Sequence, residues 1–347
     1  MQNENGSIRT YRIQDTENGI RATTGNIGAA LFSLEIPVSD GTWRDVVLGF
    51  EDPEDYRVNE PHFGASMVPC VNRIGGAAFT LNGQTYTLDK NDGENSLHGT
   101  YGLYDALWEA TEVSKNSITF SADWEGGKGK LPGPLHADVT YTVQERVLFI
   151  DYHGYAQQDT IFNPTNHSYF NLKGQGNGDV LDHLLTVYAE RMTPVGPAGV
   201  PDGTICSVDD TPFDFQLSET IGARIHEDDP ELKRAGGYDL NYILDREELF
   251  REEAYEAHGQ AMYLAARASD PDGEVTMDVY TDLPGMQLYT ANFLTGEEKG
   301  KGGARYRPQS AFCLETNYFP NAINVPAFSQ PVIHAGEHRY SRTVYRF

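Results

Sequence analysis

Cysteine is scarce in this 347-residue sequence, and the three that are present, Cys70, Cys206 and Cys313, form no CxxC pair. An odd and scattered set fits neither a disulfide framework nor a zinc site, and it is typical of proteins in a reducing compartment. We therefore expect a cytoplasmic protein in which each cysteine is a small buried apolar residue.

Long hydrophobic runs and basic residues are also in short supply. No stretch of about 18 apolar residues occurs, which argues against a membrane-spanning helix, and the N-terminal residues lack the apolar core of a signal peptide. The 26 Lys and Arg stand against 51 Asp and Glu, for a formal net charge of −25. Because nucleic acids are bound by clusters of Lys and Arg, we predict neither a nucleic-acid nor a membrane partner.

The sequence lacks complete cofactor and metal motifs. The glycines of GQGNGD (174–179) have no strand-then-helix context, GEEKGKGG (296–303) lacks the Walker spacing, and neither HExxH nor GxSxG occurs. The acidic segments HEDDPE (226–231) and SDPDGE (269–274) could attract calcium, but neither completes an EF-hand loop. We predict no metal and no cofactor, so that side chains alone carry any chemistry.

Alternation of apolar and polar residues is the dominant pattern, punctuated by 35 Gly and 18 Pro. SITFSADW (117–124) reads as a strand, and residues 138–156 read as a hairpin that turns at 144–146. FTLNGQTYTL (79–88) is a second hairpin, because Asn82-Gly83 tolerates the positive φ of a tight turn. The pattern predicts an all-β protein: one large antiparallel β-sandwich over residues 1–347.

Helical signals are few. SETIGARI (218–225) starts with a Ser N-cap and has Glu219 in its first turn, which predicts one short helix. The acidic stretch 245–259 is helix-prone, but its charge favours a solvated excursion between strands.

Polar or ionisable residues stand at the ends of several predicted strands. Each has a structural explanation when taken alone: Arg73 as a surface ion pair, His98 in a loop, Asp239 as a turn cap. Glu315 follows the apolar run AFCL, so alternation places it either on the solvent face or pointing from a rigid sheet into a cleft. His167, within NPTNHSYFNLKG (163–174), is either part of a self-capping turn or a proton donor among groups that bind a polar ligand.

Taken together and in order, these motifs resemble the aldose 1-epimerase (galactose mutarotase) family over nearly the whole chain. The matching segments are NRI (72–74), FTLNGQTYTL, NSLHG (95–99), Trp108, NHSYFNL (166–172), YD (238–239), PGMQLY (284–289), ET (315–316), FP (319–320), NVP (324–326) and a terminal Tyr-x-Phe. The resemblance implies a β-supersandwich with its site in a cleft across one sheet.

The resemblance also implies roles for seven residues. Glu315 would be the general base and His167 the general acid, while sugar hydroxyls would be bound, or the pair held, by Asn72, Arg73, His98, Asp239 and Gln287. Three departures put substrate preference in doubt: Leu240 stands where the family usually has His, Asn317 where it tends to Gln, and MVPCV (67–71) where it tends to a Gly-Arg pair.

The chemistry implied by the resemblance suits these residue types. Anomer interconversion removes the O1 proton while protonating the ring oxygen O5, and we expect a carboxylate and an imidazolium on opposite sides of this unit to do both. The expected substrate is a free hexose such as D-galactose or D-glucose, handled by a monomer or homodimer. Two alternatives stay open: a sugar-binding module without turnover, and a hexose-6-phosphate 1-epimerase, which would need extra basic residues.

Overall fold

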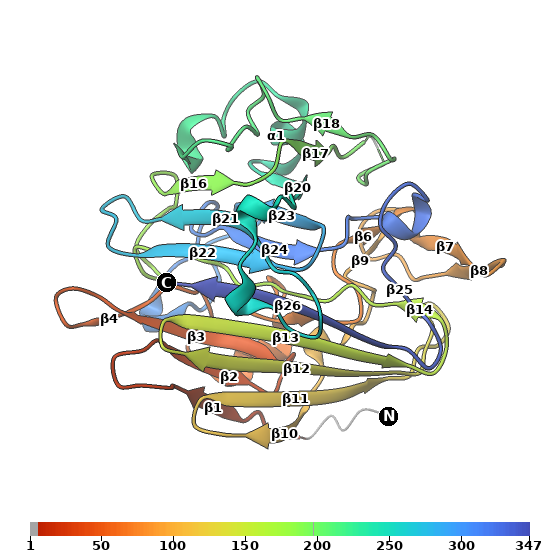
Figure 1. Ribbon diagram of the computed structural model, residues 1–347, viewed down its shortest axis with the longest axis horizontal. Coiled ribbons are helices and arrows are strands. Elements are labelled where there is room, and N and C mark those ends of the chain that lie inside the picture. The colour runs from red at the N-terminus through yellow and green to blue at the C-terminus, as the bar shows by residue number, and fades with distance from the viewer. Residues whose placement is uncertain (1–5, 197) are drawn as a thin grey trace.

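The structure, a computed structural model, describes residues 6–196 and 198–347. Its two largest sheets are both antiparallel (Figure 1). The larger sheet has nine strands, in the order β10 (Glu109–Val113), β11 (Ser117–Trp124), β12 (Leu135–Gln144), β13 (Val147–Ala156), β26 (His338–Arg346), β22 (Thr276–Thr281), β21 (Tyr263–Ser269), β16 (Leu184–Val187) and β19 (Glu219–Thr220). The smaller has five, in the order β18 (Cys206–Ser207), β17 (Arg191–Thr193), β20 (Asp239–Ile243), β23 (Gly285–Tyr289) and β24 (Cys313–Asn317). The predicted all-β antiparallel class is confirmed.

Smaller sheets complete the fold. A four-stranded sheet consists of β1 (Thr10–Ile13), β2 (Arg21–Gly25), β3 (Ala30–Pro37) and β4 (Trp43–Asp45). The two-stranded sheets are β5 (Ser66–Met67) with β15 (Thr165–Asn166), β6 (Arg73–Ile74) with β9 (Ser96–Leu97), β7 (Ala78–Leu81) with β8 (Gln84–Thr87), and β14 (Thr160–Ile161) with β25 (Val332–Ile333). The helical elements are α1 (Pro230–Ala235) and the 3₁₀ turns Pro53–Val58, Gly75–Ala77, Leu103–Asp105, Ile221–Ala223, Glu248–Phe250, Glu253–Tyr255, Lys301–Gly303 and Ala322–Asn324. Within the described part of the chain, none of the helices has the length and apolarity needed to cross a bilayer.

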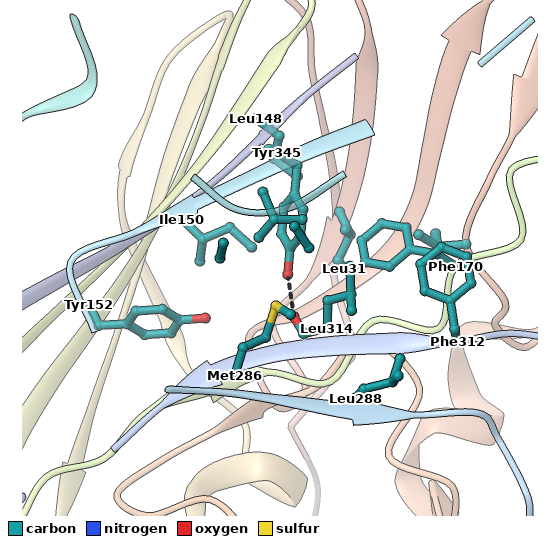
Figure 2. Packing of buried hydrophobic residues seen from close by; sticks show 14 of the residues in the cluster. Leu31, Leu148, Ile150, Tyr152, Phe170, Met286, Leu288, Phe312, Leu314 and Tyr345 are labelled. Atoms are coloured by element: carbon teal, nitrogen blue, oxygen red, sulfur yellow. Dashed lines mark hydrogen bonds between the residues drawn. The ribbon is translucent and has the colours of Figure 1, made fainter. Parts of the chain in front are cut away.

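The core lies between the two large sheets. Side chains of β23 and β24, among them Met286 and Leu314, pack toward Ile150 of β13 and Tyr345 of β26, and the Tyr345 hydroxyl donates a hydrogen bond to the Leu314 carbonyl (Figure 2). Thr316 follows the same face and hydrogen-bonds Thr343 of β26 at 2.6 Å. Since strand side chains alternate, this packing turns residues 313, 315 and 317 toward the opposite face of the small sheet.

The predicted hairpins form where expected. β7 and β8 are joined at Asn82 (φ 53°) and Gly83 (φ 77°), as a primed turn requires. β12 pairs with β13 from Leu135↔Ala156 to Gln144↔Val147, so the 138–156 hairpin is confirmed with its turn at 145–146. The 117–124 strand is β11.

The predicted helix at 218–225 is wrong. Glu219 and Thr220 pair with β16 as the edge strand β19, and a 3₁₀ turn over Ile221–Ala223 follows. Pairing with a sheet edge satisfies the backbone groups that a helix would have satisfied. The acidic stretch 245–259 is a solvated excursion as favoured, containing two 3₁₀ turns.

The α-helix that does form, α1, was not predicted; it begins at the end of the acidic segment 226–231, which was considered for calcium. Its signals are complete: the Asp229 side chain caps the N–H groups of Glu231 and Leu232, Pro230 occupies the first turn, and Gly236 ends the helix in the left-handed conformation. Six residues are too few to show a helical period, which is why the pattern of apolar residues did not reveal it.

Replacing Leu314 by Ala should destabilise the protein by about 2–5 kcal/mol, because the side chain is 1% exposed and its loss leaves a cavity between the sheets. Urea unfolding of this variant measures the loss. The matched control is Leu217→Ala, where the leucine is 83% exposed and a change within about 0.5 kcal/mol is expected. Equal effects at the two positions would contradict this account of the core.

Candidate active site

A cleft of about 670 Å³ opens on the face of the small sheet that points away from the core. β20, β23 and β24 are paired in register there, with Asn241 opposite Gln287 and Gln287 opposite Glu315. Asp239 lies two residues before Asn241 and therefore shares its face. One sheet face thus brings Asp239, Gln287 and Glu315 to the cleft.

A second group of predicted residues reaches the cleft from the short β6–β9 pair. The Asn72 N–H donates to His98 Nδ1 at 3.3 Å, and the His98 N–H donates to the Asn72 carbonyl at 3.0 Å. Asn72 and His98 both adopt positive φ, of 60° and 53°. Because Nδ1 accepts a hydrogen bond, neutral His98 carries its proton on Nε2, which makes that nitrogen a donor. Arg73 follows and donates from Nε to Asp92 at 2.6 Å.

The amides around His167 tie its segment to the chain on either side of Glu315. Asn163 accepts from the Tyr318 N–H at 2.8 Å and donates to the Tyr318 carbonyl at 3.1 Å. Asn171 donates to the Ser310 carbonyl at 3.0 Å. The partners of these amides lie about 140 to 155 residues away in sequence, so the amides fix the segment to residues that flank a distant strand.

Between those two ties, Phe170 and Phe312 exchange backbone hydrogen bonds of 2.7 and 3.0 Å. The result is that His167 Nε2 lies 3.7 Å from Glu315 Oε1, at the inner end of the cleft. We expected the acid and the base on opposite sides of the reacting unit; the structure instead places them next to each other. O1 and O5 of a cyclic sugar are bonded to the same carbon, so neighbouring groups can reach both.

Hydrogen-bonding capacity is left unused in the cleft. Gln287 donates from Nε2 to Asp239 at 2.7 Å, while its buried Oε1 has no partner among the described residues. Arg73 Nη1 stands 4.0 Å from Asp239, and no described side chain or N–H donates to the Glu315 carboxylate. Buried polar groups are normally satisfied, so these atoms are suited to binding the hydroxyls of a ligand.

Burial shifts the pKa values of the central pair in opposite directions. The pKa of Glu315 is raised to about 8 by burial and by the nearby Asp239, against the opposing effect of Arg73. The pKa of His167 is lowered to about 3 by burial and by the neighbouring His62. Between these values the pair holds one proton, so at neutral pH it contains one proton donor and one proton acceptor.

All seven predicted site residues line this cleft: Asn72, Arg73, His98, His167, Asp239, Gln287 and Glu315. Sequence reasoning missed His62 and Tyr169, which also line the cleft, and Cys313, which is buried next to His167. The His62 ring lies 5.1 Å from His98 and 6.1 Å from His167, while Tyr169 stacks on His167 at 5.0 Å. Cys313, expected to be only an apolar residue, has its Sγ 3.6 Å from His167 Nδ1. Its position two residues before Glu315 on one strand was the available signal.

Comparisons with known proteins agree with this arrangement. The aldose 1-epimerase family model matches residues 9–346. The chain belongs to the aldose 1-epimerase family. It is 36% identical to galactose mutarotase from Sus scrofa over 340 residues, covering 98% of this chain and 94% of that one, and 32% identical to aldose 1-epimerase from Escherichia coli K12 over 343 residues, covering 97% and 95%. A solved GalM/aldose epimerase homologue from C. elegans superimposes with a TM-score of 0.87 at 27% identity, covering 98% of each chain.

This aldose 1-epimerase family member is accordingly an isomerase with a galactose mutarotase-like fold. None of the residues at which it departs from the family pattern lines the cleft. Leu240 is buried on the core face of β20, and Asn317 donates to the carbonyl of Glu315 at 2.7 Å. The 67–71 segment is buried throughout.

His167 should stay neutral across the range where histidines normally titrate, because burial lowers its pKa to about 3. Two-dimensional ¹⁵N NMR of the histidine side chains measures this directly, and the His167 signals should not move between about pH 5 and 8. His136 is the internal contrast. Burial lowers its pKa, but hydrogen bonds and charge interactions with Asp123 and Asp138 outweigh this and raise it above 6.5. A His167 midpoint near that of His136 would contradict the assigned effect of burial.

Proposed function

We propose that this chain interconverts the α and β anomers of a free hexose such as D-galactose or D-glucose, with Glu315 as the base and His167 as the acid. The observation that carries the proposal is the 3.7 Å separation of His167 Nε2 and Glu315 Oε1 at the inner end of a sugar-sized cleft. One carboxylate and one imidazole at this distance can act together on two oxygens that share a carbon.

Ring opening uses both groups at once. Glu315 takes the proton from O1 while His167 gives a proton to O5, and the C1–O5 bond breaks to leave an open-chain aldehyde. Rotation about C1–C2 presents the other face of the carbonyl. Closure then runs through the same pair in reverse: His167 recovers the proton from the O5 hydroxyl, and Glu315 returns one to O1. Each transfer contributes on the order of 10²–10⁴-fold to the rate.

The proton count of the pair fits these roles. At neutral pH the pair holds one proton, and in the sugar-free cleft burial favours its residence on Glu315. Sugar hydroxyls that donate to the carboxylate favour its charged form, and that charge in turn favours the imidazolium of His167. Sugar binding therefore moves the proton to the nitrogen from which O5 needs it.

The remaining residues hold the sugar while C1 turns. Gln287 offers its free Oε1 as an acceptor, and His98 offers Nε2–H as a donor. Arg73 and Asp239 supply charge-assisted hydrogen bonds, which are stronger than neutral ones. Tyr289 lines the cleft and provides an apolar surface for the C–H side of the ring. Fixing the rest of the sugar restricts the motion to the anomeric carbon.

The charges at the outer end of the cleft favour a free sugar over a sugar phosphate. Five carboxylates line this end, those of Glu54, Asp55, Glu60, Glu297 and Glu298. The single lysine of the lining, Lys299, is already paired with Asp55 at 3.0 Å. A phosphate dianion at this end of the cleft would be repelled by these carboxylates and would have no unpaired basic residue there to pair with. A sugar-binding module without turnover is the weaker alternative, because binding alone has no need of an acid next to a base.

Glu315→Gln and His167→Gln should each lower the catalysed rate about 10²–10⁴-fold, because each removes one of the two proton transfers. Polarimetry of freshly dissolved α-D-galactose and α-D-glucose, with and without protein, measures this rate. The exposed residues Glu109 and His226 give matched controls, Glu109→Gln and His226→Gln, which should keep wild-type activity. Retained activity in a folded Glu315 or His167 variant would remove that residue from its role, and faster turnover of D-glucose 6-phosphate would favour the phosphate alternative.

The pH profile follows from the single proton of the pair. As pH rises through about 8, the raised pKa of Glu315, the pair loses its proton and the acid is gone. We therefore expect kcat/KM to fall above this pH and to stay level below it toward neutrality. Rates are corrected at each pH for the protein-free reaction, which hydroxide accelerates. A corrected kcat/KM that keeps rising through this region would mean that the active form carries no proton.

A further inference from the structure

Three buried side chains with metal-binding atoms meet where His167 and Glu315 line the cleft. His167, Cys313 and Glu315 each place one donor atom within 4.8 Å of those of the other two, and all three residues are buried. Cys313 and Glu315 come from one face of β24, and His167 comes from the segment tied beside it. Cys313 and Glu315 are two residues apart, but His167 is 146 residues from Cys313, so no local spacing motif predicts the complete set.

The distance between sulfur and nitrogen has the value that a tetrahedral metal requires. Cys313 Sγ lies 3.6 Å from His167 Nδ1. A tetrahedral zinc ion, bonded at about 2.3 Å to sulfur and about 2.0–2.1 Å to nitrogen, holds these two atoms about 3.6 Å apart. The Glu315 carboxylate lies nearest to the other ring nitrogen, with Oε1 3.7 Å from His167 Nε2, and one of its oxygens is within 4.8 Å of the other two donor atoms. It receives no hydrogen bond from a described residue, so it can turn toward an ion held by His167 Nδ1 and Cys313.

The donor set also selects the class of ion. A thiolate and an imidazole favour zinc and other thiophilic cations over Mg²⁺ or Ca²⁺, which prefer sets made of oxygen atoms alone. Three protein ligands leave a fourth position open, as in zinc sites that also bind water or another small ligand. Since His167 and Glu315 line the cleft while Cys313 does not, an ion would reach these donors from the cleft.

We propose that His167, Cys313 and Glu315 form a binding site for Zn²⁺ or another thiophilic divalent cation, and that its occupation excludes the sugar reaction. Binding replaces the Cys313 S–H bond by a metal–sulfur bond, and the released proton passes to solvent. The inhibitory part rests on the proposed function: the ion would bind the Glu315 carboxylate assigned as base and, through Nδ1, would fix the His167 ring assigned as acid. The binding part stands on the donor geometry alone.

Binding is tested without reference to activity by titrating Co²⁺ into the full chain. A thiolate bound to Co²⁺ produces a charge-transfer absorption in the near ultraviolet, which should appear in the wild type and be lost in Cys313→Ser. The matched controls Cys70→Ser and Cys206→Ser should keep the absorption. No band in the wild type, or an unchanged band in Cys313→Ser, overturns the site. Cys313→Ala with a native unfolding transition provides a second variant should the serine disturb folding.

Inhibition is tested by adding Zn²⁺ during polarimetry of D-galactose, with each variant compared with its own zinc-free rate. We expect loss of activity that EDTA reverses. Cys313→Ser should raise the Zn²⁺ concentration for half-inhibition at least about ten-fold, because removing even a residue that merely supports a metal ligand costs ~10–100-fold in affinity. Equal zinc sensitivity in the wild type and in Cys313→Ser overturns the inhibitory role. If no sugar is turned over at all, the proposed function fails while the cobalt band still decides the site.

Discussion

The proposed active site depends on one set of hydrogen bonds, those that join residues 163–171 to residues 310–318. Neither segment has a catalytic geometry of its own: His167 lies outside the large sheets, and Glu315 sits in the interior of a strand. Amide side chains and one exchanged pair of backbone bonds fix the two segments in register, and only that register brings the imidazole to the carboxylate. A buried polar group that loses its hydrogen-bond partner destabilises the fold, so any other register between the two segments is disfavoured.

Strand β24 connects this site to the stability of the whole fold. Alternate residues face opposite ways, so Leu314 and Thr316 pack against the large sheet, while on the other face Glu315 lines the cleft and Cys313 is buried next to His167. Burying Glu315 disfavours its charged form, as the raised pKa records. The apolar packing on the reverse side of the strand holds the carboxyl group in this unfavourable position, and a rigid strand positions it better than a loop would.

The sequence allowed the fold class, the main hairpins and the acid and base candidates to be predicted, because alternation and Asn-Gly turns are local signals and the family motifs are long. It did not allow α1 or the edge strand β19 to be predicted. Helix α1 is too short to show a helical period of apolar residues, and strand β19 forms only because it pairs with β16. His62 and Cys313 were missed as site residues for a related reason: their roles come from neighbours that are distant in sequence. The single-domain organisation, the cytoplasmic location and the monomeric or dimeric state stay predictions.

The short distance between His167 and Glu315 has a consequence for how the cleft can work. With the proposed roles, ring opening moves one proton onto Glu315 and one off His167, and ring closure returns both, so a full turnover leaves the pair as it began. The reaction is a closed proton circuit that needs no exchange with bulk solvent between its two halves. Such a circuit can run in the buried surroundings of these two residues, where each is about 5% exposed or less. Water can then be excluded from the reacting carbon, because the pair itself supplies and recovers the protons that the reaction needs.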